Sequence, residues 1–325
     1  MSLPDPSGYP DAPDQRDRWI LERRGPRNRL DPRRPYAFLV ESEPGPSGGP
    51  AVDVATVFLT NRECPWRCVM CDLWRNTLEE TVPPGAIAEQ IRHALERMPN
   101  LVPERSELKL YNAGSFFDPR AIPTSEYAEV ARLASPFRRT IVECHPSAAG
   151  RRVVEFRDLL GKPLEVAMGL ETVHPVVLER LNKRMTLDAF RRAAEFLAER
   201  GVALRVFILV RPPWLSEAEG LEWAKRSLDF AFECGAAVCA LIPTRGGNGA
   251  MEALAAAGEY APPSLASLEA ATEYGLSRGA GRVFADLWAV DAIPSCPSCA
   301  EARIERLRVM NATQKPAPSV ACPDC

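Results

Sequence analysis

The residues best suited to carry out chemistry are three cysteines, Cys64, Cys68 and Cys71, spaced C-x3-C-x2-C. They follow residues 54–60, a short apolar run bounded by polar residues, which predicts a buried strand. The three thiols therefore lie on a loop that leaves a strand. Three thiolates on one loop can hold three irons of a cubane cluster and leave the fourth iron open to a ligand. The alternative is a set of structural or zinc-binding cysteines, because short cysteine motifs also arise by accident.

Four more cysteines form a second candidate metal site near the end of the sequence. Cys296 and Cys299, and Cys322 and Cys325, make two C-P-x-C pairs separated by 22 residues, close to the spacing of a zinc ribbon. The spacing leaves zinc and an auxiliary iron–sulfur cluster open. We favour zinc, because no further cysteine loop or electron path is evident. This tail could grip RNA or a partner, or simply hold the end of the chain down, which we favour.

Composition limits the class of protein. The chain has 325 residues, of which 46% are hydrophobic and 26% charged, as in soluble globular proteins. No apolar run has the length of a membrane span, and the first residues lack the apolar core of a signal peptide. We therefore expect a cytoplasmic protein with reduced cysteines. In that compartment clustered cysteines indicate metal or redox chemistry more often than disulfides.

The charge distribution has one local exception. A net charge of −3 and a pI near 5.8 argue against a broad surface for polyanions. Residues 16–34, however, contain eight arginines against three acidic residues. This basic arm could contact phosphates, or it could lie solvated on an acidic barrel, which is the interpretation that we favour.

The elements that must position the first cysteines alternate in type from residue 54 onward. Strands are predicted at 54–60, 108–112, 140–144, 164–170, 202–210 and 237–242, with a possible last strand at 282–288. Helices are predicted at 84–98, 124–133, 153–160, 186–200, 216–234 and 265–278, and a short helix at 301–310 in the tail. Alternation of this kind implies parallel βαβ units with right-handed crossovers.

The predicted fold class is therefore α/β, a partial parallel (β/α)6 TIM-type barrel. We expect three parts: an N-terminal extension rich in Pro, Gly and Arg at 1–50, the barrel at 51–290, and a small four-cysteine tail at 291–325. The extension includes a loop at 43–50. In such barrels the site is built where the strands end, and polar or glycine-rich residues follow every predicted strand.

These features resemble the radical S-adenosylmethionine (SAM) superfamily over roughly residues 54–290. The closest branch includes the Elongator catalytic subunit and the radical partner of archaeosine synthase. The resemblance implies a [4Fe-4S] cluster on Cys64, Cys68 and Cys71, whose free iron is chelated by SAM. It implies cleavage of SAM by one electron to a 5′-deoxyadenosyl radical, which abstracts a hydrogen atom. It also implies a reductant such as flavodoxin or ferredoxin.

The resemblance extends to individual strand ends. The segment 112–115, with Asn112, Gly114 and Ser115, stands where the family has a glycine-rich "GGE" segment that holds the methionine amino group. It lacks the second glycine and the glutamate. Glu143 and Glu171, the latter in a "GLE(S/T)"-like segment, are implied to bind ribose hydroxyls or the amino acid of SAM. Salt bridges to arginines are the alternative for both carboxylates.

Two later strand ends complete the implied cofactor site. Arg211 could bind a SAM carboxylate or a substrate anion. Ile242 and Thr244 lie in the segment whose backbone meets the adenine edge in the family, although apolar residues of these strands are equally suited to the core.

The sequence thus predicts a radical SAM enzyme with an unknown substrate. The resemblance favours RNA modification, whereas the acidity of the chain argues against it, so a small molecule or peptide stays open. The alternative is a non-catalytic iron–sulfur or zinc protein that serves as an electron carrier or nucleic-acid adaptor. An electron carrier would not need the polar strand ends arranged around an open cluster.

Overall fold

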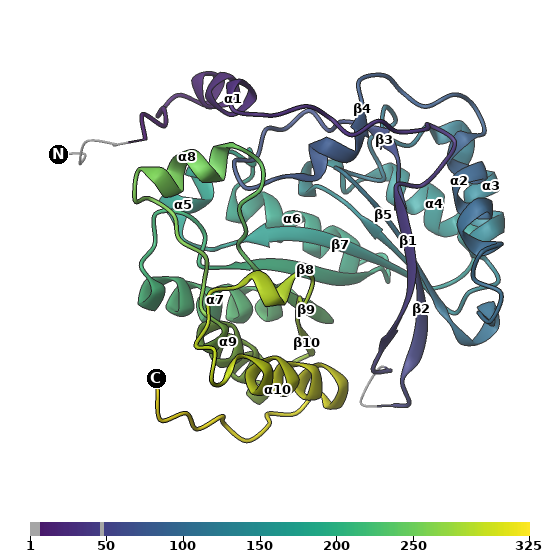
Figure 1. Ribbon diagram of the computed structural model, residues 1–325. Coiled ribbons are helices and arrows are strands. Elements are labelled where there is room, and N and C mark those ends of the chain that lie inside the picture. The colour runs from purple at the N-terminus through teal and green to yellow at the C-terminus, as the bar shows by residue number, and fades with distance from the viewer. Residues whose placement is uncertain (1–6, 46–48) are drawn as a thin grey trace.

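An eight-stranded sheet forms the centre of the computed structural model, which describes residues 7–45 and 49–325. Its order is β1-β2-β5-β6-β7-β8-β9-β10 (Figure 1). The parallel strands are β2 (Val52–Leu59), β5 (Glu107–Asn112), β6 (Thr140–Glu143), β7 (Leu164–Glu171), β8 (Ala203–Val210), β9 (Val238–Pro243) and β10 (Arg282–Ala285). The sheet curls into a half-barrel, so the predicted fold class is confirmed. The possible last strand is real and ends at Ala285.

Helices cover the convex face of the sheet (Figure 1). They are α2 (Ala86–Leu95), α3 (Tyr127–Ala134), α4 (Arg151–Leu160), α6 (Leu187–Ala198), α7 (Glu217–Glu233) and α9 (Leu265–Ser277). Their apolar stripes pack against strand residues such as Leu108, Leu110 and Val206, which are fully buried in the main core. Thr186 caps α6, and Ser216 with Glu219 forms the capping box expected for α7.

The N-terminal extension contributes a strand to the sheet. Strand β1 (Ala37–Glu43) pairs antiparallel with β2, in register from Ala37 opposite Phe58 to Glu43 opposite Val52. The loop predicted at 43–50 therefore begins one residue later, and its residues 46–48 lie outside the described residues. Helix α1 (Pro13–Glu22) precedes this strand. The boundaries expected for three separate parts stay a prediction.

Charged side chains fill the concave face of the half-barrel at the end opposite the strand C-termini. Lys109 contacts Glu43, and Arg205 bonds both Glu43 and Glu165 at 2.6–3.0 Å. Burial opposes ionisation of Glu165, but Arg205 outweighs this and holds the pKa of that carboxyl below its usual value. The paired charges fill this end of the half-barrel. A site is therefore expected at the other end, where the parallel strands have their C-termini.

The lateral edge of the sheet, formed by β10, is covered by the last helix of the chain. Helix α10 (Ala300–Thr313) corresponds to the helix predicted at 301–310 and packs on α9 and β10. Side-chain amides of Asn311 and Gln314 each exchange two hydrogen bonds with the backbone, at Ala285 and Val283 respectively. They replace the partners that a ninth strand would offer to this edge.

Two more helices and a short strand pair follow or precede the C-terminal ends of the sheet strands. Helices α5 (Pro175–Arg180) and α8 (Ala250–Ala256) follow β7 and β9, and the short pair β3 (Asn61–Arg62) and β4 (Thr77–Leu78) spans the cysteine loop. No helix among the described residues is long and apolar enough to cross a membrane.

Candidate functional site

The cysteine loop leaves β2 at the C-terminal edge of the half-barrel. Burial raises the pKa of all three thiols, to about 12 for Cys71, and the charges of Cys64 and Cys71 raise that of Cys68 further. The three thiols therefore lie in a poorly solvated place. In the described part of the chain they are not among the groups that converge on a single ion. A cubane is larger than one ion and needs more widely spaced ligands.

Gly114 lies directly against the cysteine loop. Its φ is +130°, and a Cβ at this position would stand 2.6 Å from the Cβ of Cys64. Only glycine allows both the backbone conformation and the contact. The loop after β5 is thereby brought against the first cysteine, and Ser115 beside it is fully buried with its hydroxyl 3.7 Å from the sulfur of Cys144.

Asn112 and Glu143 end the next two strands. The backbone N–H of Asn112 donates to Glu143 at 2.9 Å, and burial raises the pKa of this carboxyl to about 8. The side chain of Asn112 is 1% exposed, and neither its oxygen nor its nitrogen has a hydrogen-bond partner among the described residues. An unpaired buried amide is costly unless a ligand completes its hydrogen bonds.

A buried ion pair of Glu171, which ends β7, and Lys183, which follows α5, lies near Glu143. Lys183 donates to Glu171 at 2.5 Å, and a Cβ on Gly169 would come within 2.2 Å of both charged groups, so the glycine makes room for them. Burial opposes the charge of Lys183, but Glu171 outweighs this and raises the lysine pKa. The same cation acts electrostatically on Cys68 and Glu143. Lys183 is thus a central residue of the site.

Sequence reasoning missed Lys183, and no local signal marks it. Lysines are common and usually exposed. Only the turn after α5, where Asn182 and Arg184 have positive φ, directs this one inward.

A ring stack lines a further side of the site. Trp66 of the cysteine loop stacks on His145, which follows β6, with centroids 3.8 Å apart and planes 15° from parallel. The imidazole Nε2 lies 3.0 Å from the carbonyl oxygen of Lys183. Burial, aided by the charge of Lys183, lowers the pKa of His145 to about 3, so the ring is neutral near pH 7.

Three of the expected cofactor residues have partners within the chain. The guanidinium of Arg211 bonds Glu217 at 2.6 Å and a backbone carbonyl at 2.8 Å. The hydroxyl of Thr244 donates to Val210 at 2.9 Å, and Ile242 packs against a cluster that includes Val69 of the cysteine loop. All three lie at the strand C-termini, and their contacts with SAM stay predictions.

Asn248 is a second residue that the sequence did not reveal. Its buried amide donates to the carbonyl oxygens of Val69 at 2.7 Å and Cys71 at 3.2 Å. The loop after β9 therefore holds the end of the cysteine loop in place. Glycines at 246, 247 and 249 marked this segment as irregular, but nothing in the sequence indicated its target.

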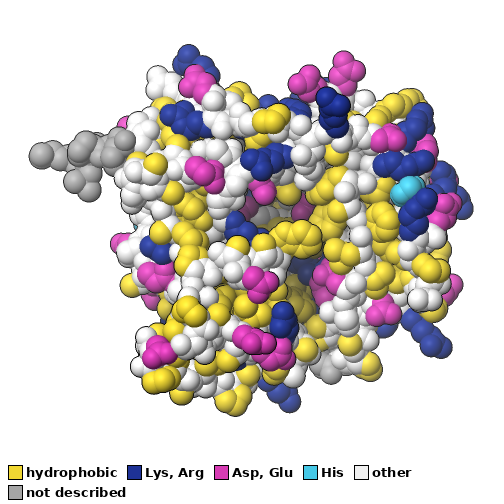
Figure 2. All heavy atoms as spheres, viewed as in Figure 1, with side chains coloured by type: hydrophobic (Ala, Val, Ile, Leu, Met, Phe, Trp, Pro, Cys, Tyr) yellow, Lys and Arg dark blue, Asp and Glu magenta, His cyan; other side chains and the backbone are white. Residues whose placement is uncertain are grey.

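The basic arm lies on the protein. Five of its arginines form ion pairs with carboxylates outside the arm: Arg16 with Glu179, Arg24 and Arg27 with Glu63, and Arg33 and Arg34 with Glu89. This arrangement favours the second interpretation of the arm. In the space-filling view the face near this arm is hollowed towards its centre, with charged side chains visible inside (Figure 2).

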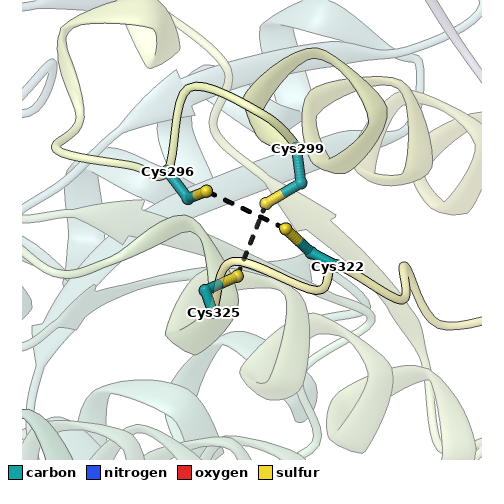
Figure 3. A group of neighbouring side chains, drawn as sticks. All are labelled: Cys296, Cys299, Cys322 and Cys325. Carbon is teal, nitrogen blue, oxygen red and sulfur yellow. Dashed lines mark hydrogen bonds between the residues drawn. The ribbon is translucent and has the colours of Figure 1, made fainter.

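The four tail cysteines converge (Figure 3). Their ligand atoms all lie within 4.8 Å of one another, with sulfur–sulfur distances of 3.9 Å for Cys296–Cys322 and 3.7 Å for Cys299–Cys325. Arg303 of α10 points Nε at the sulfur of Cys299, 3.2 Å away. This group could hold a metal ion.

No family model matches the chain. It is 28% identical to archaeosine synthase subunit beta of Methanosarcina acetivorans over 228 residues, 66% of this chain and 64% of that protein. It is 23% identical to an uncharacterized protein of Methanocaldococcus jannaschii over 209 residues, 62% of this chain and 57% of that protein. The chain therefore spans less than two thirds of the length of these relatives.

Among solved structures, Elp3 of Methanocaldococcus infernus superposes with a TM-score of 0.52 at 13% identity, covering 68% of this chain and 57% of that one. The chain resembles the radical SAM superfamily. The resemblance to Elongator and archaeosine synthase that the sequence predicted is confirmed by these comparisons. At this identity the structural likeness concerns the radical SAM fold alone.

Proposed function

We propose that this protein is a radical SAM enzyme. One observation carries the proposal: a loop with three cysteines lies against a group of buried polar residues that includes Asn112, whose side-chain amide lacks a partner among the described residues. Gly114 makes the contact between this group and Cys64. A three-ligand site beside unsatisfied polar groups suits a cluster with an open iron and a second, polar cofactor.

Each residue of this group, and the cysteine loop beside it, has a proposed role. Cys64, Cys68 and Cys71 hold the [4Fe-4S] cluster. The pair of Lys183 and Glu171 offers one charge of each sign, which matches the carboxylate and ammonium of an amino acid such as the methionine part of SAM. Asn112 and Ser115 add hydrogen-bonding groups, and Glu143 accepts from a hydroxyl or ammonium.

When bound, a cluster held by Cys64, Cys68 and Cys71 would supply the electron, and SAM would supply the radical that removes a hydrogen atom from the substrate. The chain itself orients SAM and limits water. Trp66 and His145 cover one side as a neutral stacked pair.

The substrate and partners are proposed from the resemblance. RNA modification is the favoured reaction class, and the name of the Methanosarcina relative as a subunit supports a partner subunit. The reductant is a flavodoxin or ferredoxin. The internal pairing of the basic arm leaves it fewer charges for phosphates, so RNA contacts would come from other surfaces.

The test is anaerobic reconstitution with iron and sulfide, followed by dithionite and SAM and chromatography for 5′-deoxyadenosine. We expect the nucleoside from the wild type and none above background from Cys68→Ala. Cys234→Ala is the matched control, because this cysteine lies at the end of α7, outside both cysteine groups. A wild type that holds the cluster but never cleaves SAM would support the electron-carrier alternative.

For the tail we propose a single zinc ion. Zinc–thiolate bonds of about 2.3 Å in a tetrahedron place sulfurs roughly 3.8 Å apart, in keeping with the 3.7 and 3.9 Å found here. Metal analysis of protein purified without reconstitution tests this: one zinc per chain is expected. Iron and sulfide at the tail in a Cys68→Ala background would contradict it.

A further inference from the structure

The N-terminal segment reaches the residue that precedes the first cysteine. Arg24 contacts one oxygen of Glu63 at 2.7 Å, and Arg27 contacts the other at 2.5 Å. The side chains of Arg24 and Glu63 are only 8% and 10% exposed. The ion pair of Arg24 with Glu63 is therefore shielded from water, unlike ordinary surface pairs.

A third arginine belongs to the cysteine loop itself. Arg67 lies 3.1 Å from Glu63, and it also donates to the carbonyl oxygens of Cys64 at 2.6 Å and Trp66 at 3.1 Å. Three guanidinium groups thus surround one carboxylate. An excess of positive charge remains beside Cys64.

The same segment fixes the far end of the loop. Arg27 donates to the carbonyl oxygen of Trp74 at 3.0 Å, and the guanidinium of Arg24 lies over the Trp74 ring, 4.8 Å from its centroid. The backbone N–H of Asn28 donates to Arg75 at 2.9 Å. The cations consequently have fixed positions relative to the cysteines, so their field at the loop is fixed too.

Charge near an iron–sulfur cluster sets its reduction potential, together with hydrogen bonds and burial. A cation stabilises the reduced cluster, which carries one more electron, and so raises the potential. Arg67 stands between two of the cysteines in the sequence and donates to the carbonyl oxygen of Cys64. Arg24 and Arg67 both contact Glu63, the residue before Cys64, so the two cations lie beside the first cysteine of the loop.

We propose that Arg24, Arg27 and Arg67, centred on Glu63, form a charge clamp that holds the cysteine loop and raises the reduction potential of its cluster. The clamp makes the N-terminal segment part of the redox centre. Its arginines are positioning residues, because they act through the loop. This inference rests on the proposed cluster at Cys64, Cys68 and Cys71.

The test is a redox titration of the reconstituted full chain, followed by electron paramagnetic resonance of the reduced cluster. Arg24→Gln removes a cation and is expected to shift the midpoint potential to more negative values. Glu63→Gln removes the anion and is expected to shift it to more positive values. Shifts of opposite sign at the two ends of one ion pair identify electrostatic control. A purely structural clamp would affect both variants alike.

Two further variants sharpen the result. Arg24→Lys keeps the charge and is expected to restore most of the potential. Arg18→Gln is the matched control, because Arg18 is an exposed arginine of α1 that does not belong to the charge clamp. The reduction potential of this variant is expected to equal that of the wild type. If Arg24→Gln fails to hold a cluster, the decision passes to Arg27→Gln, whose side chain is 28% exposed.

The outcomes distinguish a failure of the charge clamp from a failure of the radical SAM proposal on which it rests. Full cluster content with an unchanged potential, or shifts of the same sign in Arg24→Gln and Glu63→Gln, overturns the clamp and leaves the radical SAM proposal standing. A wild type that assembles no [4Fe-4S] cluster overturns both.

Discussion

The two cysteine groups of this chain are built in opposite ways. The loop site has three thiols at a buried strand end, and next to it stands a polar side chain without a partner, Asn112. The tail site has four thiols within 4.8 Å of one another, carried by two segments that flank α10. The number of ligands and the polar groups around them together distinguish a site with a free coordination position from one whose coordination shell is complete. Three ligands beside unsatisfied polar groups leave room for chemistry, whereas four converging ligands complete the shell of one ion.

The most direct test of the difference between the two sites is to remove one ligand from each of them. Cys68→Ala is expected to abolish iron–sulfur content and SAM cleavage while the tail metal stays. Cys322→Ser is expected to release the tail metal and lower stability by about 2 kcal/mol or more, roughly 4–8 °C in Tm, with the cluster spectrum retained. Metal analysis, absorbance and thermal unfolding measure these effects. If either variant emptied both sites, the two groups would not be independent.

A second prediction concerns the wall of the open site. Gly114→Ala introduces a Cβ against Cys64 at a φ that side chains rarely adopt, a strain of about 1–3 kcal/mol. We expect reduced cluster content and weaker SAM binding, measured by iron analysis and calorimetry. Gly161→Ala is the control, because its φ is also positive and its added Cβ meets nothing within 4 Å. Equal losses in both variants would assign the effect to backbone strain alone.

A third prediction tests the surroundings of the closed site. Arg303 contacts the sulfurs of Cys299 and Cys325 and pairs with the buried Glu269. Arg303→Gln is expected to weaken zinc binding by about 10–100-fold, as loss of an outer-shell partner typically does. Competition with a coloured chelator measures this. Arg308→Gln on the exposed face of α10 should leave the affinity unchanged.

A last prediction is a pH dependence of stability that arises from the open site. The pKa of Glu143 is raised from 4.5 to about 8 by burial, so between these values the folded chain binds more protons than the unfolded chain. The stability of the cofactor-free protein should therefore fall as pH rises from about 5 to 8. Glu143→Gln should flatten this decline in denaturant titrations. An unchanged slope would mean that Glu143 ionises normally.

Much of the fold could be predicted from the sequence, because the parallel strands are short apolar runs and the helices carry clear apolar stripes. Strand β1 was missed as a strand because Glu41 and Glu43 interrupt its apolar pattern, and their partner Lys109 lies on β5, on the other side of β2. Helix α5 was missed because it has six residues. Short elements are stabilised by tertiary contacts more than by local propensity.

The sequence by itself determined the chemistry that each cysteine group can support. The spacing of Cys64, Cys68 and Cys71 places three ligands on one loop, and the paired tail cysteines supply four, since both facts are local along the chain. Only the tertiary structure decided what surrounds them. The inward turn of Lys183, the unpaired amide of Asn112 and the arginines around Glu63 all arise from contacts between distant segments. Burial and charge at a point in space depend on every element that packs there, and no local pattern records them.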